Sequence, residues 1–569
     1  MGWFVGILGK NQSLKKKLPS LFSEAAFQTE TESFFIAGGG LDSTFHFKND
    51  IDSKSGWIAS GIGISTGDAP HLFHQSHWDN SIEYGADYLH KINGHFAVAK
   101  WDEHQVELIT DQLGMRNIFL HKGDNFIVFS TRLDWIIKLV PKASIAWRNF
   151  GSRWLAINQF SSQSFVHKIQ RISQGGVGVI KANEVKINHQ RWQYKELDTS
   201  PEDFKNSLLA FSTIPLKDGR SLSLGLSGGL DSRTLLATLL QVPEQDWVLH
   251  TFGEKDHPDL QTAAELNRLF GRTHHIFHEK IPNAQLLEKL IPEYIGQTLF
   301  TASPSHLVGF QAYQRLSELN LSVVDGAFGE IARRRFMVSI LLRAKKAVVD
   351  KDVDSLLPHL KLQKADIFTE DCNMLMLEGF RQDLSEELHA MPDTTEIGLE
   401  NWLDFFTIRT RVHNTAGPEQ ARSDAYLLNY MPFLQPELIQ QALNLPLHYR
   451  KNAKLFRQHI KEVAPELQKS PLIKGSVSYP YWMKDVSSAL WMRIKQKLGK
   501  HYSSTLQADF LIELEEYVRD IFSSQSAQEF PAYDHQKIEQ LITGFYDDKN
   551  MAIANELNWC LAFEVFRRL

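Results

Sequence analysis

The chain has 569 residues, of which 43% are hydrophobic and 22% charged, a composition typical of a globular protein large enough for two or more domains. No stretch approaches the roughly eighteen apolar residues of a membrane span, so we expect no membrane insertion. A net charge of −6 argues against a basic surface, so we expect no nucleic-acid partner. The only cysteines, Cys372 and Cys560, exclude a disulfide scaffold and a multi-cysteine zinc site, and they predict a reducing, cytoplasmic location.

Residues 1–195 contain short β-prone segments separated by turn residues, which predicts an antiparallel sandwich. The turn-like stretch Gly38-Gly-Gly-Leu-Asp-Ser43 lies between two of these segments. An alternating segment follows it instead of a helix, so we expect a hairpin turn there. The Lys15–Lys17 run is predicted to be a solvated loop. The β-prone segments are Phe34–Ala37, His95–Trp101, Val106–Thr110, Asn125–Ser130 and Gly176–Ile180.

The stretch Ser221–Arg233 carries the strongest chemical signal. Alternating leucines from Leu222 predict a buried strand, Thr234 onward predicts a helix, and Ser227-Gly-Gly-Leu-Asp-Ser232 forms the turn between them. Two glycines allow positive φ and bring bare N–H groups close to an anion at a helix start. A Walker loop would need Gly-Lys-Ser or Gly-Lys-Thr, whereas this turn carries Asp231, an oxygen ligand suited to magnesium on a pyrophosphate. We interpret it as a pyrophosphate loop that releases AMP; the alternative is a turn that only lets strand and helix pack.

The motif Ser-Gly-Gly-Leu-Asp-Ser resembles the ATP-binding motif in the synthetase half of asparagine synthetases and their relatives, the β-lactam synthetases and the lasso-peptide cyclases. The resemblance implies that residues 196–569 form an α/β parallel-sheet domain, adenine nucleotide α-hydrolase-like, with a helical C-terminal extension. It also implies ATP and Mg²⁺ as cofactors, and formation of an acyl-adenylate from which an amine displaces AMP. The implied cofactor-binding residues are Leu226, Ser227, Gly228, Gly229, Leu230, Asp231, Ser232, Phe252, Asp325 and Gly326.

The first third is similar in order and spacing to the glutaminase domain of asparagine synthetases, through Asn93–Asp102, Asp111–Arg116 and Phe129-Ser130. That similarity implies an α+β, Ntn-type αββα sandwich that begins with a nucleophilic cysteine. Here Gly2 stands at the cysteine's position, and a glycine offers no nucleophile. We therefore expect a scaffold domain without glutamine hydrolysis.

Pro201 and the polar stretch Glu196–Asn206 predict a hinge between the domains. Beyond it, Trp247–Gly253 reads as a strand, Asp259–Phe270 as a helix and Thr273–Phe277 as a strand, which predicts βαβ units with ligands at the carboxyl ends of the strands. Residues His274, His275 and His278 could suggest a metal. Their side chains would alternate between faces of a strand, so ordinary polar positions are the favoured interpretation.

A second Gly-punctuated turn, Asp325-Gly-Ala-Phe-Gly-Glu330, follows another β-branched strand and resembles the family's second ATP motif. The resemblance implies that Asp325 replaces a serine, that Gly326 is kept, and that Glu330 takes the place of a magnesium-binding aspartate, so Asp231 and Glu330 are the expected metal ligands. Ala327 stands where β-lactam synthetases carry a catalytic tyrosine, which argues against their specific chemistry here. The Arg333–Arg335 run could contact a phosphate, but we favour a solvated face.

Residues 335–450 have a largely helical pattern, and Gln435 replaces the aspartate of a Pro-Phe-Leu-Asp helix start, most simply with a structural role. The Lys454–Arg457 segment and Lys474 match a Lys-x-x-Arg helix and a lysine before a glycine in the family. A reaction that develops an oxyanion needs a mobile cation, so Lys474 is our catalytic candidate, with Lys454 and Glu330 beside it. The last ninety residues read as packed helices that shape the substrate pocket.

The combined interpretation is an AMP-forming amide synthetase whose amine comes from the substrate itself, which resembles macrolactam formation by lasso-peptide cyclases. The expected partners are a carboxylate substrate, specifically a ribosomal precursor peptide, and a leader-peptide protease or recognition protein. Two alternatives stay open: ammonia-dependent amidation of a small acid or sugar acid, which needs only a narrow acceptor pocket, and a non-catalytic nucleotide-binding relative. The sequence identifies neither the acceptor nor the general base.

Overall fold

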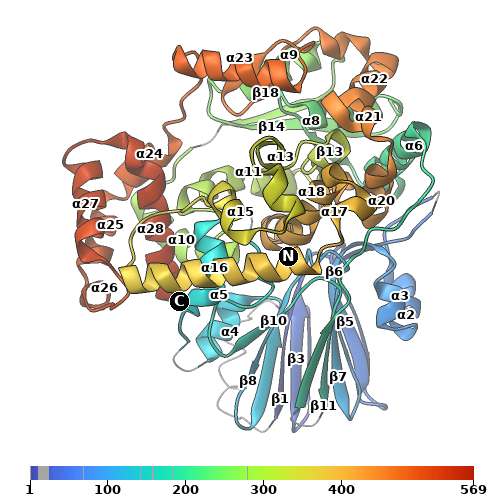
Figure 1. Ribbon diagram of the computed structural model, residues 1–569. Coiled ribbons are helices and arrows are strands. Elements are labelled where there is room, and N and C mark those ends of the chain that lie inside the picture. The colour runs from blue at the N-terminus through green and yellow to red at the C-terminus, as the bar shows by residue number, and fades with distance from the viewer. Residues whose placement is uncertain are drawn as a thin grey trace.

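The computed structural model describes residues 2–9, 25–67, 69–140, 143–156, 159–181, 184–278 and 280–569. The predicted loop at Lys15–Lys17 lies outside these residues. Figure 1 shows two sheet-rich parts joined by a large helical region, with the N-terminal strands at one end of the molecule and the C-terminal helices at its side. No helix in the described ranges is long and apolar enough to cross a membrane.

The N-terminal part contains two six-stranded antiparallel sheets, which confirms the predicted sandwich. One has the order β10-β8-β9-β1-β3-β2 and the other the order β12-β11-β7-β6-β5-β4. The first is built from β1 (Trp3–Gly9), β2 (Phe27–Glu30), β3 (Phe34–Gly39), β8 (Ile118–Lys122), β9 (Phe126–Ser130) and β10 (Ile169–Ile172). The second is built from β4 (Phe45–Asp50), β5 (Ser55–Ile64), β6 (Asn93–Trp101), β7 (Gln105–Thr110), β11 (Gly176–Lys181) and β12 (Glu184–His189).

Apolar clusters divide this part into four layers, helix on sheet on sheet on helix. Phe4, Ile58 and Phe129 belong to the core between the two sheets. Helices α2 (Gln75–Glu83) and α3 (Ala86–Leu89) cover the outer face of one sheet through Trp78. Helices α4 (Leu133–Leu139) and α5 (Trp147–Leu155) cover the outer face of the other sheet. Alternation along each strand supplies an apolar side chain to each of two buried faces.

The turn at Gly38–Ser43 is not a hairpin, so that prediction is wrong. Strand β3 pairs with β1 and β2, whereas β4 pairs with β5 in the facing sheet. The turn therefore carries the chain from one sheet to the other. Alternation predicted the second strand correctly, but the period of a strand does not specify the sheet in which it pairs.

The predicted hinge is shorter than Glu196–Asn206, because helix α6 (Pro201–Ser212) already begins at Pro201. The Ser200 hydroxyl accepts a hydrogen bond from Asp203 N–H, and the Asp203 carboxylate accepts one from Ser200 N–H. This reciprocal cap, with proline in the first helical turn, fixes a helix start within a polar stretch that reads as a linker.

The second part is built on a five-stranded sheet of order β15-β14-β13-β16-β17, in which every neighbouring pair is parallel. Its strands are β13 (Leu222–Gly225), β14 (Trp247–Gly253), β15 (His274–His278), β16 (Ser322–Val324) and β17 (Asn429–Tyr430). Helices α8 (Leu230–Leu239) and α9 (Pro258–Arg268) follow the first two of these strands. The predicted βαβ arrangement is therefore confirmed, and the carboxyl ends of β13, β14 and β16 meet at one edge of the sheet.

The remaining chain is mostly helical, as predicted. Its C-terminal helices share one apolar core with α4 and α5 of the first part, through residues such as Trp154, Phe368 and Phe563. The longer helices are α10 (Ala284–Thr298), α11 (Leu307–Glu318), α16 (Glu370–Ala390), α18 (Leu399–Thr407), α19 (Gly417–Ser423), α20 (Pro436–Asn444), α22 (Lys454–Val463), α23 (Asp485–Lys497), α24 (Leu506–Glu513), α25 (Glu515–Ser523), α27 (His535–Tyr546) and α28 (Ala554–Arg567). The shorter elements used below are α12 (Glu330–Arg333), α13 (Val338–Arg343), β18 (Leu472–Lys474) and β19 (Val477–Tyr479).

Candidate functional site

The predicted pyrophosphate loop lies between β13 and α8. The helix begins at Leu230, four residues earlier than predicted, so Asp231 and Ser232 stand in its first turn. The hydroxyls of Ser227 and Ser232 lie 2.9 Å apart, and Ser227 N–H donates to the Ser232 hydroxyl. This arrangement directs a helix N-terminus and its free N–H groups toward the loop, which favours a negatively charged ligand.

The glycines of the loop serve a different purpose from the one predicted. Neither Gly228 nor Gly229 has a positive φ. A Cβ on Gly228 would lie 2.2 Å from Ile473 Cγ1, so the close approach of β18 is what requires glycine. Gly228 C=O accepts from Ile473 N–H at 2.9 Å, and Gly228 N–H donates to Asp259 Oδ1 at 2.7 Å. The loop is therefore held against the strand that carries Lys474.

Replacing Gly228 by alanine is expected to lower the rate of AMP formation by about 100-fold, because the added methyl displaces Ile473 and with it Lys474. Gly225→Ala is the matched control, since a Cβ there makes only ordinary contacts with His250. Pyrophosphate release measured for both variants checks the expectation. Equal rates in the two variants would show that the contact with Ile473 does not position Lys474.

Arg233 also ties the loop to β18, a role that the sequence did not reveal. Its buried guanidinium donates to the carbonyls of Leu467, Ser470 and Pro471, which precede β18, and to the carbonyl of Gly228. A planar group with several donors can satisfy such a set of carbonyls at once. The sequence shows only that Arg233 directly follows the loop, which does not reveal its carbonyl partners.

Arg333 lies close to the carboxylates of both Asp231 and Glu330. The Arg333 guanidinium forms an ion pair with the Asp231 carboxylate, and its Nη2 lies 3.7 Å from Glu330 Oε1. Burial raises the pKa of Asp231 to about 6, against the opposing effect of Arg333. Asp231 Oδ1 is buried without a hydrogen-bond partner among the described residues.

These two carboxylates fit a magnesium ion, because Mg²⁺ commonly takes one or two protein carboxylates and completes its shell with phosphate oxygens and water. The unpartnered Asp231 Oδ1 is the oxygen available for it. No larger cluster of three or more histidine, cysteine or acidic side chains positioned for a metal occurs in the described ranges.

The Arg333–Arg335 run is not a solvated face, so that interpretation is wrong. Arg334 is buried and its Nη1 lies 3.0 Å from Asp404 Oδ1, while Arg335 Nη1 lies 2.6 Å from Asp485 Oδ1. Each arginine of the run therefore has a separate carboxylate partner inside the protein. A run of like charges does not indicate, by itself, whether acids elsewhere in the chain are folded against it.

A cavity of about 640 Å³ opens at the carboxyl ends of β13, β14 and β16. Nearly all of the expected site residues line it, together with the cations Arg333, Arg335, Arg411 and Arg457. Gly228 does not line it, and neither does Lys454, whose exposed side chain lies over the Tyr449 ring at 5.1 Å. The expected residues that line the cavity are Leu226, Ser227, Gly229, Leu230, Asp231, Ser232, Phe252, Asp325, Gly326, Glu330 and Lys474.

Lys474 enters this cavity from the end of β18. Its ammonium group has no ion-pair or hydrogen-bond partner within the described part of the chain. Burial lowers the pKa of Lys474, and the nearby Arg335 and Arg333 lower it further. A cation without a protein partner, held beside other cations, is placed to bind negative charge supplied by a ligand.

Leu226 and Phe252, the residues expected beside adenine, differ in exposure. Leu226 is buried and its N–H donates a hydrogen bond to His250 C=O, whereas the Phe252 side chain is partly exposed. Both line the cavity. The histidines of β15 lie at the edge of the sheet, where His274 Nε2 contacts the Thr251 hydroxyl at 2.9 Å.

A second cavity of about 680 Å³ adjoins the first, and Phe252, Asp325 and Ala327 line both. Its lining includes four aromatic side chains, Phe252, Tyr294, Phe310 and Tyr313. The small side chain of Ala327 stands at the junction. Ser504, Leu506 and Gln507 also line the second cavity, so the C-terminal residues do contribute to a pocket.

Glu419 is the acidic side chain that the sequence did not single out. It projects from α19 into the second cavity and has no hydrogen-bond or ion-pair partner of its carboxylate in the described ranges. Its pKa is raised, chiefly because the surrounding protein disfavours the charged form. Arg422, one turn further along α19, lines the same cavity. Nothing in the sequence around Glu419 distinguishes it from other surface acids on helices.

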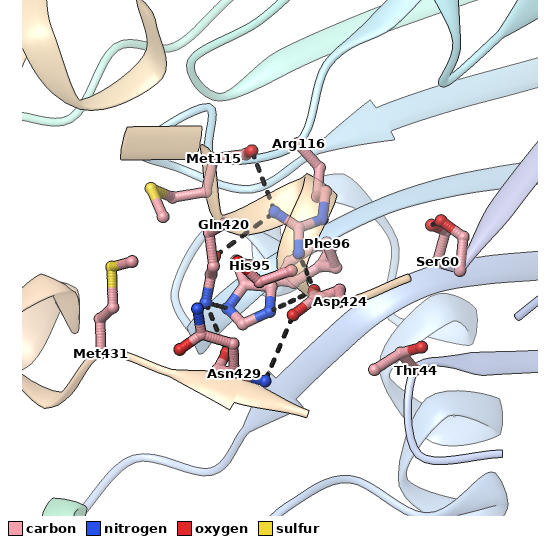
Figure 2. A network of polar contacts seen from close by, with 12 residues as sticks. Thr44, Ser60, His95, Phe96, Met115, Arg116, Gln420, Asp424, Asn429 and Met431 are labelled. Atoms are coloured by element: carbon pink, nitrogen blue, oxygen red, sulfur yellow. Dashed lines mark hydrogen bonds and ion pairs between the residues drawn. The ribbon is translucent and has the colours of Figure 1, made fainter. Parts of the chain in front are cut away.

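In the N-terminal part, residues of the glutaminase-like stretch contact the second part of the chain. Figure 2 shows His95 and Arg116 directed at Asp424, with Gln420 beside them. Burial alone would raise the pKa of Asp424, but Arg116 and His95 hold it below its ordinary value. Gln435 accepts from Gly94 N–H at 2.9 Å, which gives this helix-start residue the structural role that was expected.

The surroundings of Gly2 leave no room for a side chain. A Cβ on Gly2 would stand 2.1 Å from the backbone oxygen of Thr44 and 3.1 Å from Ser60 Oγ, whose hydroxyl donates to Gly2 C=O. Both neighbours are labelled in Figure 2. Position 2 therefore has neither a thiol nor room for the side chain that would carry one.

Gly2→Cys is therefore expected to lower the melting temperature and to produce no glutamate from glutamine, since overpacking of this kind costs about 1–3 kcal/mol. Thermal unfolding and a glutamate assay measure the two effects. Gly2→Ala adds the Cβ without the thiol and should lower the melting temperature equally. Glutamate production by the cysteine variant would contradict the steric argument.

Comparison with known proteins gives one family match. Residues 78–193 match the model of the glutamine amidotransferase domain. This range falls within the part that resembles a glutaminase domain in sequence and forms the four-layered part of the structure. Among curated proteins, none matches the chain.

Solved structures give distant likenesses. The chain resembles NMN synthetase from Francisella tularensis with a TM-score of 0.19 and 16% identity, over 24% of this chain and 58% of that one. It resembles glutamine PRPP amidotransferase from B. subtilis with a TM-score of 0.23 and 9% identity, over 57% and 81%. It resembles the U34-tRNA thiolase NcsA from Methanococcus maripaludis with a TM-score of 0.19 and 16% identity, over 39% and 79%. The chain thus spans less than two thirds of the first of these proteins.

Proposed function

We propose that this chain is an ATP-dependent amide synthetase that activates a carboxylate as an acyl-adenylate and couples it to an amine. The observation that carries the proposal is the junction of two cavities at Asp325 and Ala327. One cavity contains the Ser227–Ser232 loop and the unpartnered Lys474, and the other is lined by aromatic side chains and by Glu419. A nucleotide in the first cavity and an acceptor in the second would meet where the two cavities join.

In the first step a carboxylate oxygen of the substrate attacks the α-phosphorus of ATP, and pyrophosphate leaves. The loop N–H groups, Arg333 and Arg335 bind the negative oxygens of the polyphosphate. Asp231 and Glu330 would hold Mg²⁺, which would neutralise part of the pyrophosphate charge. The side chains of Leu226 and Phe252 offer apolar surface to adenine.

In the second step the amine nitrogen attacks the acyl carbon, a C–N bond forms, and the bond from the acyl carbon to the AMP oxygen breaks. Lys474 stabilises the oxyanion that develops on the acyl oxygen. Glu419 accepts the proton that the amine must lose, because its carboxylate lies in the acceptor cavity without a partner and its raised pKa brings it closer to neutral pH.

We further propose that the amine belongs to the substrate, so the product is a macrolactam formed within a ribosomal precursor peptide. Gly2 removes the thiol that would release ammonia from glutamine, and a tethered amine has a high effective concentration. An acceptor cavity of about 680 Å³ is also larger than ammonia and a small acid require, which favours the peptide over the small-acid alternative. A leader-peptide protease or recognition protein remains an expected partner of such an enzyme.

ATP–pyrophosphate exchange across a panel of acids and peptides, followed by mass spectrometry of the products, tests the proposal. The expected product is the substrate peptide less one water, and added ammonium or glutamine should not change its rate. A product that gains ammonia nitrogen in place of a hydroxyl would establish simple amidation instead. ATP binding without pyrophosphate exchange for any substrate would favour a nucleotide-binding relative without catalysis.

A further inference from the structure

Helix α23 (Asp485–Lys497) turns its apolar side chains away from the protein. Ser488 is its only buried residue, whereas Val486 is 81% exposed, Leu490 60% and Ile494 46%. Trp482 just before the helix is 72% exposed, and Leu498 just after it is 64% exposed. A surface helix normally buries its apolar face and exposes its polar one, so this helix has the opposite orientation.

We call the exposed apolar residues on and beside this helix the α23 ridge: Trp482, Val486, Leu490, Trp491, Ile494 and Leu498. From Val486 to Leu498 the aliphatic members recur every four residues, the spacing that places side chains on one helix face. Contiguous exposed apolar surface of this kind marks an interaction site.

The other face of α23 is fixed to the candidate active site. Asp485 pairs with Arg335 at 2.6 Å, and both Asp485 and Ser488 line the 640 Å³ cavity together with Met483. Lys495 Nζ donates to Ser478 C=O at 3.0 Å, which attaches the C-terminal half to β19. The helix is therefore anchored through its polar face, and the ridge cannot turn inward without breaking these contacts.

The charge around the ridge is opposite to that of the whole chain. Between residues 484 and 500 the acidic side chain is Asp485, which is paired inward with Arg335. Of the basic residues, three lie on the helix and two lie just beyond its ends, and Lys495 is the one also bonded to β19. The chain as a whole has a net charge of −6. Lys495 Nζ also lies 5.6 Å from the centre of the Trp491 ring. The basic residues are Lys484, Arg493, Lys495, Lys497 and Lys500.

We propose that the α23 ridge binds an anionic lipid surface. Aliphatic residues and tryptophans on one face, flanked by lysine and arginine, are the features of a helix that lies in the membrane interface. Basic residues near such a surface are attracted by anionic headgroups. A second copy of the chain is disfavoured, because two ridges packed together would bring their lysines and arginines against one another.

The position of the helix agrees with this occupant. Figure 1 shows α23 lying lengthwise along one end of the molecule, at the end opposite the N-terminal sheets. A helix at such an edge can lie flat on a surface without the rest of the protein intervening. Because α23 also lines the nucleotide cavity, docking would hold the mouth of that cavity close to the membrane.

Co-sedimentation of the full chain with large phosphatidylglycerol vesicles tests the proposal, with phosphatidylcholine vesicles as the neutral comparison. We expect binding to the anionic vesicles that weakens with salt, and at least about 10-fold weaker binding by the double variant Leu490→Glu, Ile494→Glu. The charge variant Arg493→Glu, Lys497→Glu should weaken binding similarly. Leu342→Glu is the matched control, since Leu342 is 75% exposed on a different helix, α13, and should leave binding unchanged.

Circular dichroism and thermal unfolding verify that the variants fold. Absence of vesicle binding, equal binding to both lipids, or binding that the double variant retains would overturn the proposal. Light scattering of the vesicle-free protein supplies a further outcome. A dimer that Leu490→Glu, Ile494→Glu dissociates would assign the ridge to a second copy and would also overturn it.

Discussion

Lys474→Ala is expected to lower the rate of AMP formation at least about 100-fold while ATP binding changes little. Lys474 enters the 640 Å³ cavity from β18 without a protein partner among the described residues, so in the proposed mechanism its charge is available to the oxyanion that develops during reaction. A cation that acts only on this developing charge lowers the barrier without strengthening ground-state binding. Single-turnover kinetics and ATP titration separate the two quantities.

The pH dependence supplies a second measurement of the same prediction. Because burial lowers the pKa of Lys474 from that of an ordinary lysine, the active ammonium form is lost as the pH rises through this lowered pKa. The rate should therefore fall at a lower alkaline pH than an unperturbed lysine would give. Lys474→Arg should keep part of the activity and shift this decline upward, because arginine stays protonated. Weaker ATP binding in Lys474→Ala, with an unchanged rate at saturation, would assign Lys474 to the ground state.

Asp231→Asn is expected to reduce pyrophosphate release at least about 100-fold, since it removes the carboxylate that, in the proposed mechanism, faces the polyphosphate and would hold magnesium. The fold should persist, because the raised pKa of Asp231 means that the protein disfavours its charged form already. The neutral amide relieves that burial penalty but leaves Arg333 without its main partner. Exchange assays at several magnesium concentrations, beside thermal unfolding, measure both effects.

Glu330→Gln is the companion to this variant, and we expect a smaller loss. Glu330 is 40% exposed on its side chain and lies 3.7 Å from Arg333, so solvent can replace part of its contribution. Wild-type rates in Asp231→Asn would refute the assignment of the loop. A silent Glu330→Gln would show that the second turn does not hold the metal.

The sequence predicted the parallel sheet, and the turns that line the cavity at its edge, because those features follow from local patterns. Apolar alternation gave β13 and β14, and the Ser227–Ser232 turn identified the loop between β13 and α8. Contacts between distant segments left no such pattern. The pairing of Arg335 with Asp485, the reach of Arg233 to the residues before β18, and the position of Glu419 all depend on tertiary packing.

The predictions that failed share a physical cause. The sequence indicated that the loop requires glycine at position 228, but it gave the wrong reason. The glycine permits the close approach of Ile473 and does not adopt a positive φ, and Ile473 lies far along the chain. The Gly38–Ser43 turn was correctly followed by a strand, yet the partner of that strand belongs to the other sheet. Local periodicity constrains a backbone segment, whereas its neighbours are selected by the whole fold.

The apolar core shared by α4, α5 and the C-terminal helices has a consequence for how the chain unfolds. The N-terminal part has a glycine and no thiol at residue 2, so a chain without this part would lose no nucleophile from that position. Its outer helices, however, pack Trp154 and Phe150 directly against Phe563 of α28 and Phe300, so deletion would expose that apolar wall to water. We therefore expect the two parts to unfold as one cooperative unit, and we expect the second part to fold poorly without the first.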